Sequence, residues 1–195
     1  MRNAETPRLK FALYGAHCSL GSALLVELLS RQHEAVALLD DLNSLTARPG
    51  LRTKPADLYD PISVSESVAG MDAVLCLFNA DRLPSSPASP QGFEQALAAL
   101  LSGLPRVNVD RLLLVADFPR IEQDPSVQRG LQQLTATPLR WTLIDAEHSE
   151  PGLSIEDLAR ASDDPQHETL RRLAAGIVDE LEQPRHLRER IHFRL

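Results

Sequence analysis

The sequence predicts an α/β protein with a doubly wound, mostly parallel sheet and helices on both faces. Short runs of consecutive apolar residues recur along the chain, each of the length of one buried strand. Amphipathic segments with helical spacing separate these runs. Because strands that alternate with helices are typical of parallel crossover units, the pattern indicates a parallel sheet. The 195 residues, 43% of them hydrophobic, suffice for one core, so we expect a single domain over residues 1–195.

The first crossover unit is the clearest part of the pattern. The apolar run at 10–14 (KFALY) ends at Gly15, and the turn GAHCSLG follows it. Apolar residues at helical spacing then predict a helix that begins near 19–21 and continues through SALLVELLSRQ. The run at 34–40 (EAVALLD) completes a strand, turn, helix and strand, which is the size of a βαβ unit.

The alternation continues to the C-terminus. We expect further strands at 52–58, 71–78, 111–116, 139–146 and 190–195, and helices at 61–69, 93–101, 125–135, 155–161 and 169–182. Ser63 and Glu66 have the spacing of a capping box at the first of these helices. Residues 82–91 hold three prolines and three serines, which predict a loop. The expected strand order is 3-2-1-4-5-6, with the first and fourth strands adjacent.

Composition narrows the classes of partner and compartment. The net charge of −7 argues against nucleic acid or an anionic membrane as the main partner. Two cysteines form no disulfide framework, which favours a reducing cytoplasm. The first residues lack an apolar signal core, and no apolar run approaches the roughly 20 residues that span a bilayer. We therefore expect a cytoplasmic protein without a membrane or nucleic-acid partner.

Five segments carry a family resemblance, and they cover nearly the whole chain in the family's order. They are KFALYGAHCSLGSALLVELLSRQHEAVALLDD, ADLYDPISVSESVAGMDAVLCLF, RLLLVA, RWTLIDAEHSEPG and AAGIVDELEQPRHLRERIHFRL. The chain resembles the atypical short-chain dehydrogenase/reductases, particularly their small NAD(P)H-binding, NmrA-like and flavin-reductase-like members. The resemblance implies a Rossmann-like fold that binds a dinucleotide across the carboxyl ends of the strands.

The resemblance also implies a set of cofactor-binding residues. The pyrophosphate would lie on the glycine turn, formed by Gly15, Ala16, His17, Cys18, Ser19, Leu20 and Gly21. Asp40 would accept hydrogen bonds from the adenosine ribose and repel a 2′-phosphate, which favours NAD over NADP. Asp57 and Leu58 would lie beside the adenine, and Phe78 and Asn79 would flank the cofactor. Three alternatives stay open: Asp40 as a polar strand end, Asp57 as a turn former, and Phe78 as a core residue.

The turn departs from the family pattern G-A-T-G-x-x-G at its centre, where His17 and Cys18 replace the threonine and the middle glycine. The middle glycine lets the backbone approach the pyrophosphate closely, and the cysteine side chain intrudes there. If the position needs a positive φ, a residue other than glycine costs a further 1 kcal/mol or so. We therefore expect weakened NAD binding.

The acid of the family's hydride chemistry is absent. The family uses a Tyr-x-x-x-Lys pair, but the tyrosines and lysines here are Tyr14, Tyr59, Lys10 and Lys54, and none has this order and spacing. Some small relatives reduce substrates by positioning alone, so that route stays open. His17 and Cys18 lack the further ligands of a metal site. We therefore assign no catalytic residue and no metal.

Three functions remain as hypotheses. A degenerate Rossmann-like protein could regulate, sense or scaffold through a protein partner or a homodimer, and the short 147–164 segment favours this because relatives build their substrate pocket there. A dinucleotide could still bind and support sensing or a redox reaction. The cleft could also hold a different small molecule.

Overall fold

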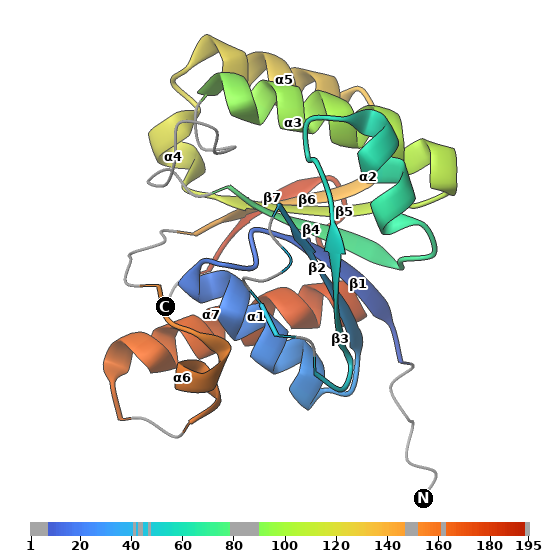
Figure 1. The fold of residues 1–195 in the computed structure, drawn as a ribbon. Coiled ribbons are helices and arrows are strands. Elements are labelled where there is room, and N and C mark those ends of the chain that lie inside the picture. The colour runs from blue at the N-terminus through green and yellow to red at the C-terminus, as the bar shows by residue number, and fades with distance from the viewer. Residues whose placement is uncertain are drawn as a thin grey trace, which may run out of the picture.

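The computed structural model describes residues 8–40, 42, 45–46, 48–78, 90–146, 152–160 and 163–193. These residues form one α/β domain around a seven-stranded sheet in the order β3-β2-β1-β4-β5-β6-β7 (Figure 1). Every neighbouring pair is parallel. The strands are β1 (Lys10–Tyr14), β2 (Glu34–Leu39), β3 (Leu51–Pro55), β4 (Ala73–Phe78), β5 (Arg111–Ala116), β6 (Arg140–Asp145) and β7 (Glu189–His192).

Helices cover both faces of the sheet. One layer contains α1 (Ser19–Ser30), α6 (Ile155–Ala159) and α7 (Pro165–Glu182), and the other contains α2 (Pro61–Val68), α3 (Pro90–Gly103) and α5 (Pro125–Thr135) (Figure 1). Two short elements, the 3-10 helix η2 (Leu104–Val107) and α4 (Phe118–Ile121), flank β5 in the chain. The predicted doubly wound parallel sheet is therefore confirmed.

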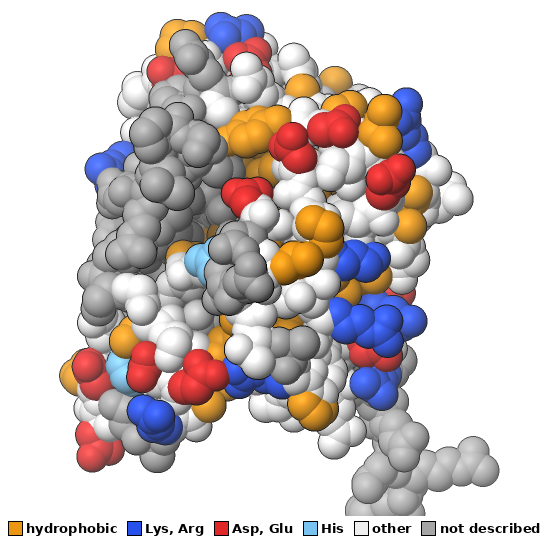
Figure 2. Space-filling model, viewed as in Figure 1, with side chains coloured by type: hydrophobic (Ala, Val, Ile, Leu, Met, Phe, Trp, Pro, Cys, Tyr) orange, Lys and Arg blue, Asp and Glu red, His pale blue; other side chains and the backbone are white. Residues whose placement is uncertain are grey.

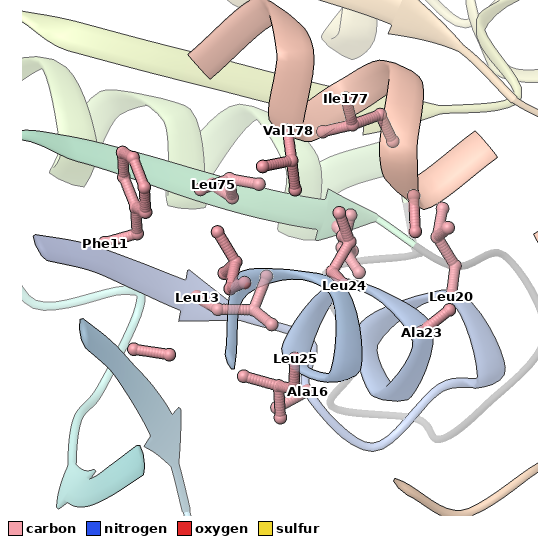
Figure 3. Close-up of a cluster of buried hydrophobic side chains, with 14 of the residues drawn as sticks. Phe11, Leu13, Ala16, Leu20, Ala23, Leu24, Leu25, Leu75, Ile177 and Val178 are labelled. Atoms are coloured by element: carbon pink, nitrogen blue, oxygen red, sulfur yellow. The ribbon is translucent and has the colours of Figure 1, made fainter. Parts of the chain in front are cut away.

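The strand residues alternate between two cores, one under each helical layer. In β1, Phe11 and Leu13 belong to the core on the α1 and α7 side, whereas Ala12 and Tyr14 belong to the opposite core. Figure 3 shows Leu13 of β1 and Leu75 of β4 facing side chains of α1 and α7. Because most strands are buried on both faces, they appear in the sequence as continuous apolar runs.

The predicted elements are present, and their boundaries shift by a few residues. The capping box at Ser63 and Glu66 is wrong: Asp60 caps α2, and its carboxylate accepts the N–H groups of Ile62 and Ser63. Proline at the next position is suited to be the first helical residue, so α2 begins at Pro61, about one turn before a helix capped by Ser63 would begin. α3 begins at Pro90, so the predicted loop lies mostly outside the described residues.

Candidate functional site at the carboxyl edge of the sheet

The chain leaves β1 and β4 toward opposite faces of the sheet, and this reversal creates the switch point at which such folds bind ligands. Gly15 follows β1 with a φ of 87°, a conformation that side chains rarely adopt. A Cβ on Gly15 would lie 2.8 Å from the Cβ of Leu77 in β4. Glycine is therefore required at the turn by both its dihedral angle and its neighbour.

Gly21 allows the close approach of α1 to the end of β1. A Cβ on Gly21 would lie 2.4 Å from the Gly15 carbonyl oxygen and 2.9 Å from the Ala16 backbone. Ala16 and Leu20 are both 1% exposed and belong to the core beneath α1. Because their side chains are buried in this core, only their backbone groups are suited to contact a ligand.

Cys18 is the N-cap of α1. Its φ is −81°, so cysteine causes no left-handed strain here, contrary to the concern raised by the missing glycine. Its Sγ accepts the Gly21 N–H at 3.2 Å and donates to the Gly15 carbonyl oxygen at 3.2 Å. The thiol thus occupies one of the N–H donors that a helix N-terminus offers to an anion.

A cavity of about 250 Å³ adjoins the glycine turn. Exposed His17 lines it with Ser22, Arg48 and Ser154. Glu156 also lines the cavity, and the hydrogen bond from Arg48 at 2.5 Å holds the pKa of this carboxyl below its usual range. Ser19 accepts the Leu153 N–H at 2.9 Å, which ties the segment before α6 to the start of α1.

Asp40, Asp57 and Tyr59 gather at the carboxyl ends of β2 and β3. Asp40 is exposed directly after β2. Asp57 forms a turn, because its carboxylate accepts the Tyr59 N–H at 2.8 Å and its own N–H donates to Ser63. Burial, and then the negative charges of Asp40 and Asp57, raise the pKa of Tyr59. Tyr59 therefore belongs to this group, although no sequence motif pointed to it.

Two residues predicted to contact the cofactor lie in the core, and a third lies outside the described residues. Leu58 is 7% exposed, and the Phe78 ring lies 4.6 Å from the Phe93 ring between centroids. Phe78 thus has the core role left open as its alternative. Asn79 is outside the described residues.

Neither tyrosine–lysine combination forms an acid at the site. The Tyr14 hydroxyl lies 3.2 Å from the Ser67 hydroxyl inside the core, and burial raises its pKa. Lys54 donates to the Ser67 carbonyl oxygen, and Lys10 lies at the amino end of β1. After β5, Asp117 caps α4. The missing Tyr-x-x-x-Lys pair therefore has no spatial substitute made of tyrosine and lysine.

Sequence reasoning missed a charged cluster at the carboxyl ends of β6 and β7. Asp145 is 8% exposed, and its two carboxylate oxygens lie 2.9 and 2.8 Å from Arg190 Nε. His192 Nδ1 lies 2.6 Å from the same carboxylate. Glu122 accepts from Arg190 at 2.6 Å, and the Arg190 guanidinium lies 5.5 Å from the centre of the Phe118 ring. The pairings of β5 with β6 and of β6 with β7 bring these residues together from distant parts of the chain, so no local motif could reveal them.

Surface charge, metal-binding groups and membrane-spanning helices bear on other classes of site. Figure 2 shows acidic and basic side chains interspersed over both layers. The described residues hold no group of three side chains suited to a metal ion. None of the helices they form has the length and apolar content needed to cross a bilayer.

Comparison with known proteins identifies the family. Two similar solved structures are a Rossmann-fold NAD(P)-binding family protein from Shigella flexneri (TM-score 0.69, 13% identity, 95% of this chain and 93% of that one) and the oxidoreductase ylbE from Lactococcus lactis (TM-score 0.69, 15% identity, 94% and 90%). A third is the Bordetella bronchiseptica enzyme WbmH in complex with NAD+ (TM-score 0.62, 15% identity, 96% and 76%). These likenesses show the fold. A search of curated proteins finds no match. The model of the NAD(P)H-binding family matches residues 15–151, so the chain belongs to that family.

Proposed function

We propose that this protein binds a nicotinamide dinucleotide along the carboxyl edge of the sheet and uses it in a redox reaction. The observation that carries the proposal is the retained turn geometry, in which Gly15 and Gly21 bring the α1 N-terminus against the switch point. A helix N-terminus at this place offers N–H groups and a positive dipole end to a pyrophosphate. Membership of the NAD(P)H-binding family supports the same ligand class.

The altered turn weakens this site without closing it. Cys18 offers its sulfur to the Gly21 N–H, and thiol sulfur is a weak hydrogen-bond acceptor. A charged phosphate oxygen accepts a stronger hydrogen bond and can displace the sulfur. We therefore expect binding that is weaker than in a turn with the middle glycine but still measurable.

Two charged residues support NAD rather than NADP. The exposed Asp40 carboxylate follows β2, where it would meet the adenosine ribose and repel a 2′-phosphate. Arg48 lines the neighbouring cavity, but its guanidinium is already paired with Glu156. The charges that a 2′-phosphate would meet at this end of the site therefore disfavour its binding.

Calorimetric titration with NAD, NADH, NADP and NADPH tests the proposal. We expect a Kd near 10 µM for NAD or NADH, which corresponds to about −7 kcal/mol, and at least tenfold weaker binding of the phosphorylated pair. Asp40→Ser should reduce that tenfold difference without changing the affinity for NAD more than a few fold. Millimolar or weaker binding of all four nucleotides would contradict the proposal.

A regulatory protein without redox chemistry is the second candidate. It is favoured by the buried Tyr14 and by the Cys18 thiol, which satisfies the helix end without any ligand. In that case the four nucleotides should bind no tighter than about −4 kcal/mol, the millimolar level. The same titration therefore separates the two candidates.

A further inference from the structure

We propose that His192, oriented by Asp145, is the acid–base residue of this protein, and that the substrate it protonates is a carbonyl compound such as an aldehyde or ketone. The assignment rests on the proposed dinucleotide binding. It supplies the acid that the absent Tyr-x-x-x-Lys pair would otherwise supply.

His192 lies in one row with the end of the nucleotide cleft. The register pairs Phe78 with Ala116, Ala116 with Asp145, and Asp145 with His192 across four neighbouring strands. Strands lie about 4.8 Å apart, so His192 is roughly 10 Å along the carboxyl edge from Ala116. In a doubly wound sheet the second mononucleotide lies over the half that begins with β4. This half would carry the nicotinamide if residues 15–21 hold the pyrophosphate, and His192 would then lie on the substrate side.

The hydrogen bond to Asp145 fixes the tautomer of the imidazole. A carboxylate paired with an arginine only accepts hydrogen bonds, so Nδ1 of His192 must carry the hydrogen in the 2.6 Å contact. Nε2 is then left to bind or release a proton. The His192 side chain is 64% exposed, whereas that of Asp145 is 7% exposed. A buried carboxylate that orients an accessible imidazole is the arrangement that general acid–base catalysis requires.

Arg190 fixes the carboxylate from its other side. The guanidinium contacts Asp145 and Glu122 and lies over the Phe118 ring, so groups from β6 and from α4 and its C-cap hold it. The two carboxylates raise the pKa of Arg190 although its partial burial acts to lower it. Arg190 therefore remains charged and holds the Asp145 carboxylate by hydrogen bonds, and its role is to position the pair rather than to exchange protons.

The proposed step balances in atoms and electrons. A reduced nicotinamide dinucleotide supplies a hydride when bound. As the carbonyl carbon gains that hydride as a C–H bond, the C=O π pair moves to the oxygen. Protonated His192 transfers its Nε2 proton to this oxygen, which completes the alcohol, and neutral His192 recovers a proton from water.

The chain provides a matched control at the other end of β7. His186 Nδ1 lies 2.8 Å from the Glu180 carboxylate, and its side chain is 44% exposed. This pair has the same chemistry as the His192–Asp145 pair, but it precedes β7 and lies at the amino edge of the sheet. A catalytic role of His192 predicts different results at the two sites, whereas a role in stability alone predicts similar ones.

The test compares His192→Asn with His186→Asn in NADH-dependent reduction of a panel of aldehydes and ketones. Asparagine retains an N–H near the position of Nδ1 but has no group at Nε2. We expect His192→Asn to lower kcat by roughly 10²- to 10⁴-fold, with the Kd for NADH unchanged within twofold. His186→Asn should keep kcat within twofold. Nitrogen-15 NMR of labelled histidine should show Nδ1–H in neutral His192, and its titration midpoint should coincide with that of the kcat/KM pH profile.

Three results would overturn the assignment. One is kcat within twofold of the unsubstituted protein in His192→Asn, and another is NMR evidence for Nε2–H in neutral His192. The third is NADH binding without reduction of any panel member. If NADH itself fails to bind, the proposed function fails, and the assignment falls with it. The binding titration distinguishes that failure from a failure of the His192 role alone.

Discussion

The Cys18 thiol accepts a hydrogen bond from the Gly21 N–H at 3.2 Å, across the first turn of α1. This contact places a weak acceptor where the proposed site needs a phosphate oxygen. Cys18→Gly should therefore raise the affinity for NAD by about tenfold, or about 1.4 kcal/mol. The φ of Cys18 is −81°, which any residue adopts without strain, so the gain comes from removing the thiol and not from relief of backbone strain. Isothermal titration calorimetry measures the gain.

Cys18→Ser is the matched control for this prediction. Serine is among the preferred N-cap residues, and its hydroxyl accepts the Gly21 N–H better than sulfur does. It should raise the melting temperature but leave the affinity for NAD unchanged or lower. If Cys18→Gly binds NAD no better than Cys18→Ser does, the thiol is not what limits binding.

Gly21→Ala should abolish nucleotide binding and destabilise the fold. The added Cβ would lie 2.4 Å from the Gly15 carbonyl oxygen, so β1 and α1 must separate. Overpacking of this kind costs about 1–3 kcal/mol, occasionally more, and here it also distorts the turn. Urea unfolding and calorimetry measure the two effects.

Gly70→Ala is the control for Gly21→Ala. Gly70 has a φ of 77°, but a Cβ there would meet nothing within 4 Å. The substitution should cost about 1–2 kcal/mol for its left-handed backbone and leave NAD binding unchanged. Equal losses of NAD binding in the two variants would show that the contact with Gly15 is not what matters.

The sequence predicted the strand order and the glycine turn because both depend on local signals. Buried parallel strands produce unbroken apolar runs, and Gly15 ends the first of them. The structure adds a packing reason for Gly15 and Gly21, since a Cβ at either position would lie within 3 Å of neighbouring atoms. The predicted N-cap of α2 was wrong. Asp60 and Ser63 are both suitable cap residues, and only the structure shows that the Asp60 side chain accepts the first N–H groups of the helix.

Residues brought together by distant strands could not be predicted in this way. His192 belongs to no sequence motif, and its sequence neighbours give no hint of a partner. Its contact with Asp145 joins residues 47 positions apart through the β6–β7 register. A one-residue slip of β7 would direct Ile191 toward Asp145 instead, so the cluster depends on a register that no pattern in either strand determines.

Glu180→Ala should destabilise the fold strongly. Glu180 and Arg111 have side chains only 4% and 3% exposed, and Arg111 donates to the carboxylate at 3.0 Å. The same carboxylate accepts the N–H groups of Arg185 and His186, which holds the turn before β7. Its removal leaves a buried guanidinium without its counter-charge, which costs about 3–5 kcal/mol.

Glu94→Ala supplies the comparison for Glu180→Ala. Glu94 forms a two-point ion pair with Arg129, but the arginine side chain is 55% exposed. Loss of such a surface pair should change the free energy of unfolding far less than loss of the buried pair, because solvent screens exposed charges. Urea unfolding at neutral pH measures both variants. A cost for Glu180→Ala below that for Glu94→Ala would show that the buried pair contributes little.

The stability of the fold should fall as the pH rises above 9, because two acids are buried in their neutral forms. Burial raises the pKa of the Cys76 thiol from its ordinary value of 9.0 and that of the Tyr14 hydroxyl from 10.0. Above these ordinary values the unfolded chain loses protons that the folded protein retains, so the stabilisation present at lower pH is progressively lost. Each group can contribute a slope of up to about 1.4 kcal/mol per pH unit.

Two variants separate the contributions of the two groups. Cys76→Ala should lower stability at every pH because it leaves a cavity, but it should flatten the decline between pH 9 and 10. Tyr14→Phe should flatten the decline only above pH 10. Unfolding free energies from urea titrations at half-unit steps from pH 8 to 11 test this, and a decline of unchanged slope in Cys76→Ala would assign the loss to other groups.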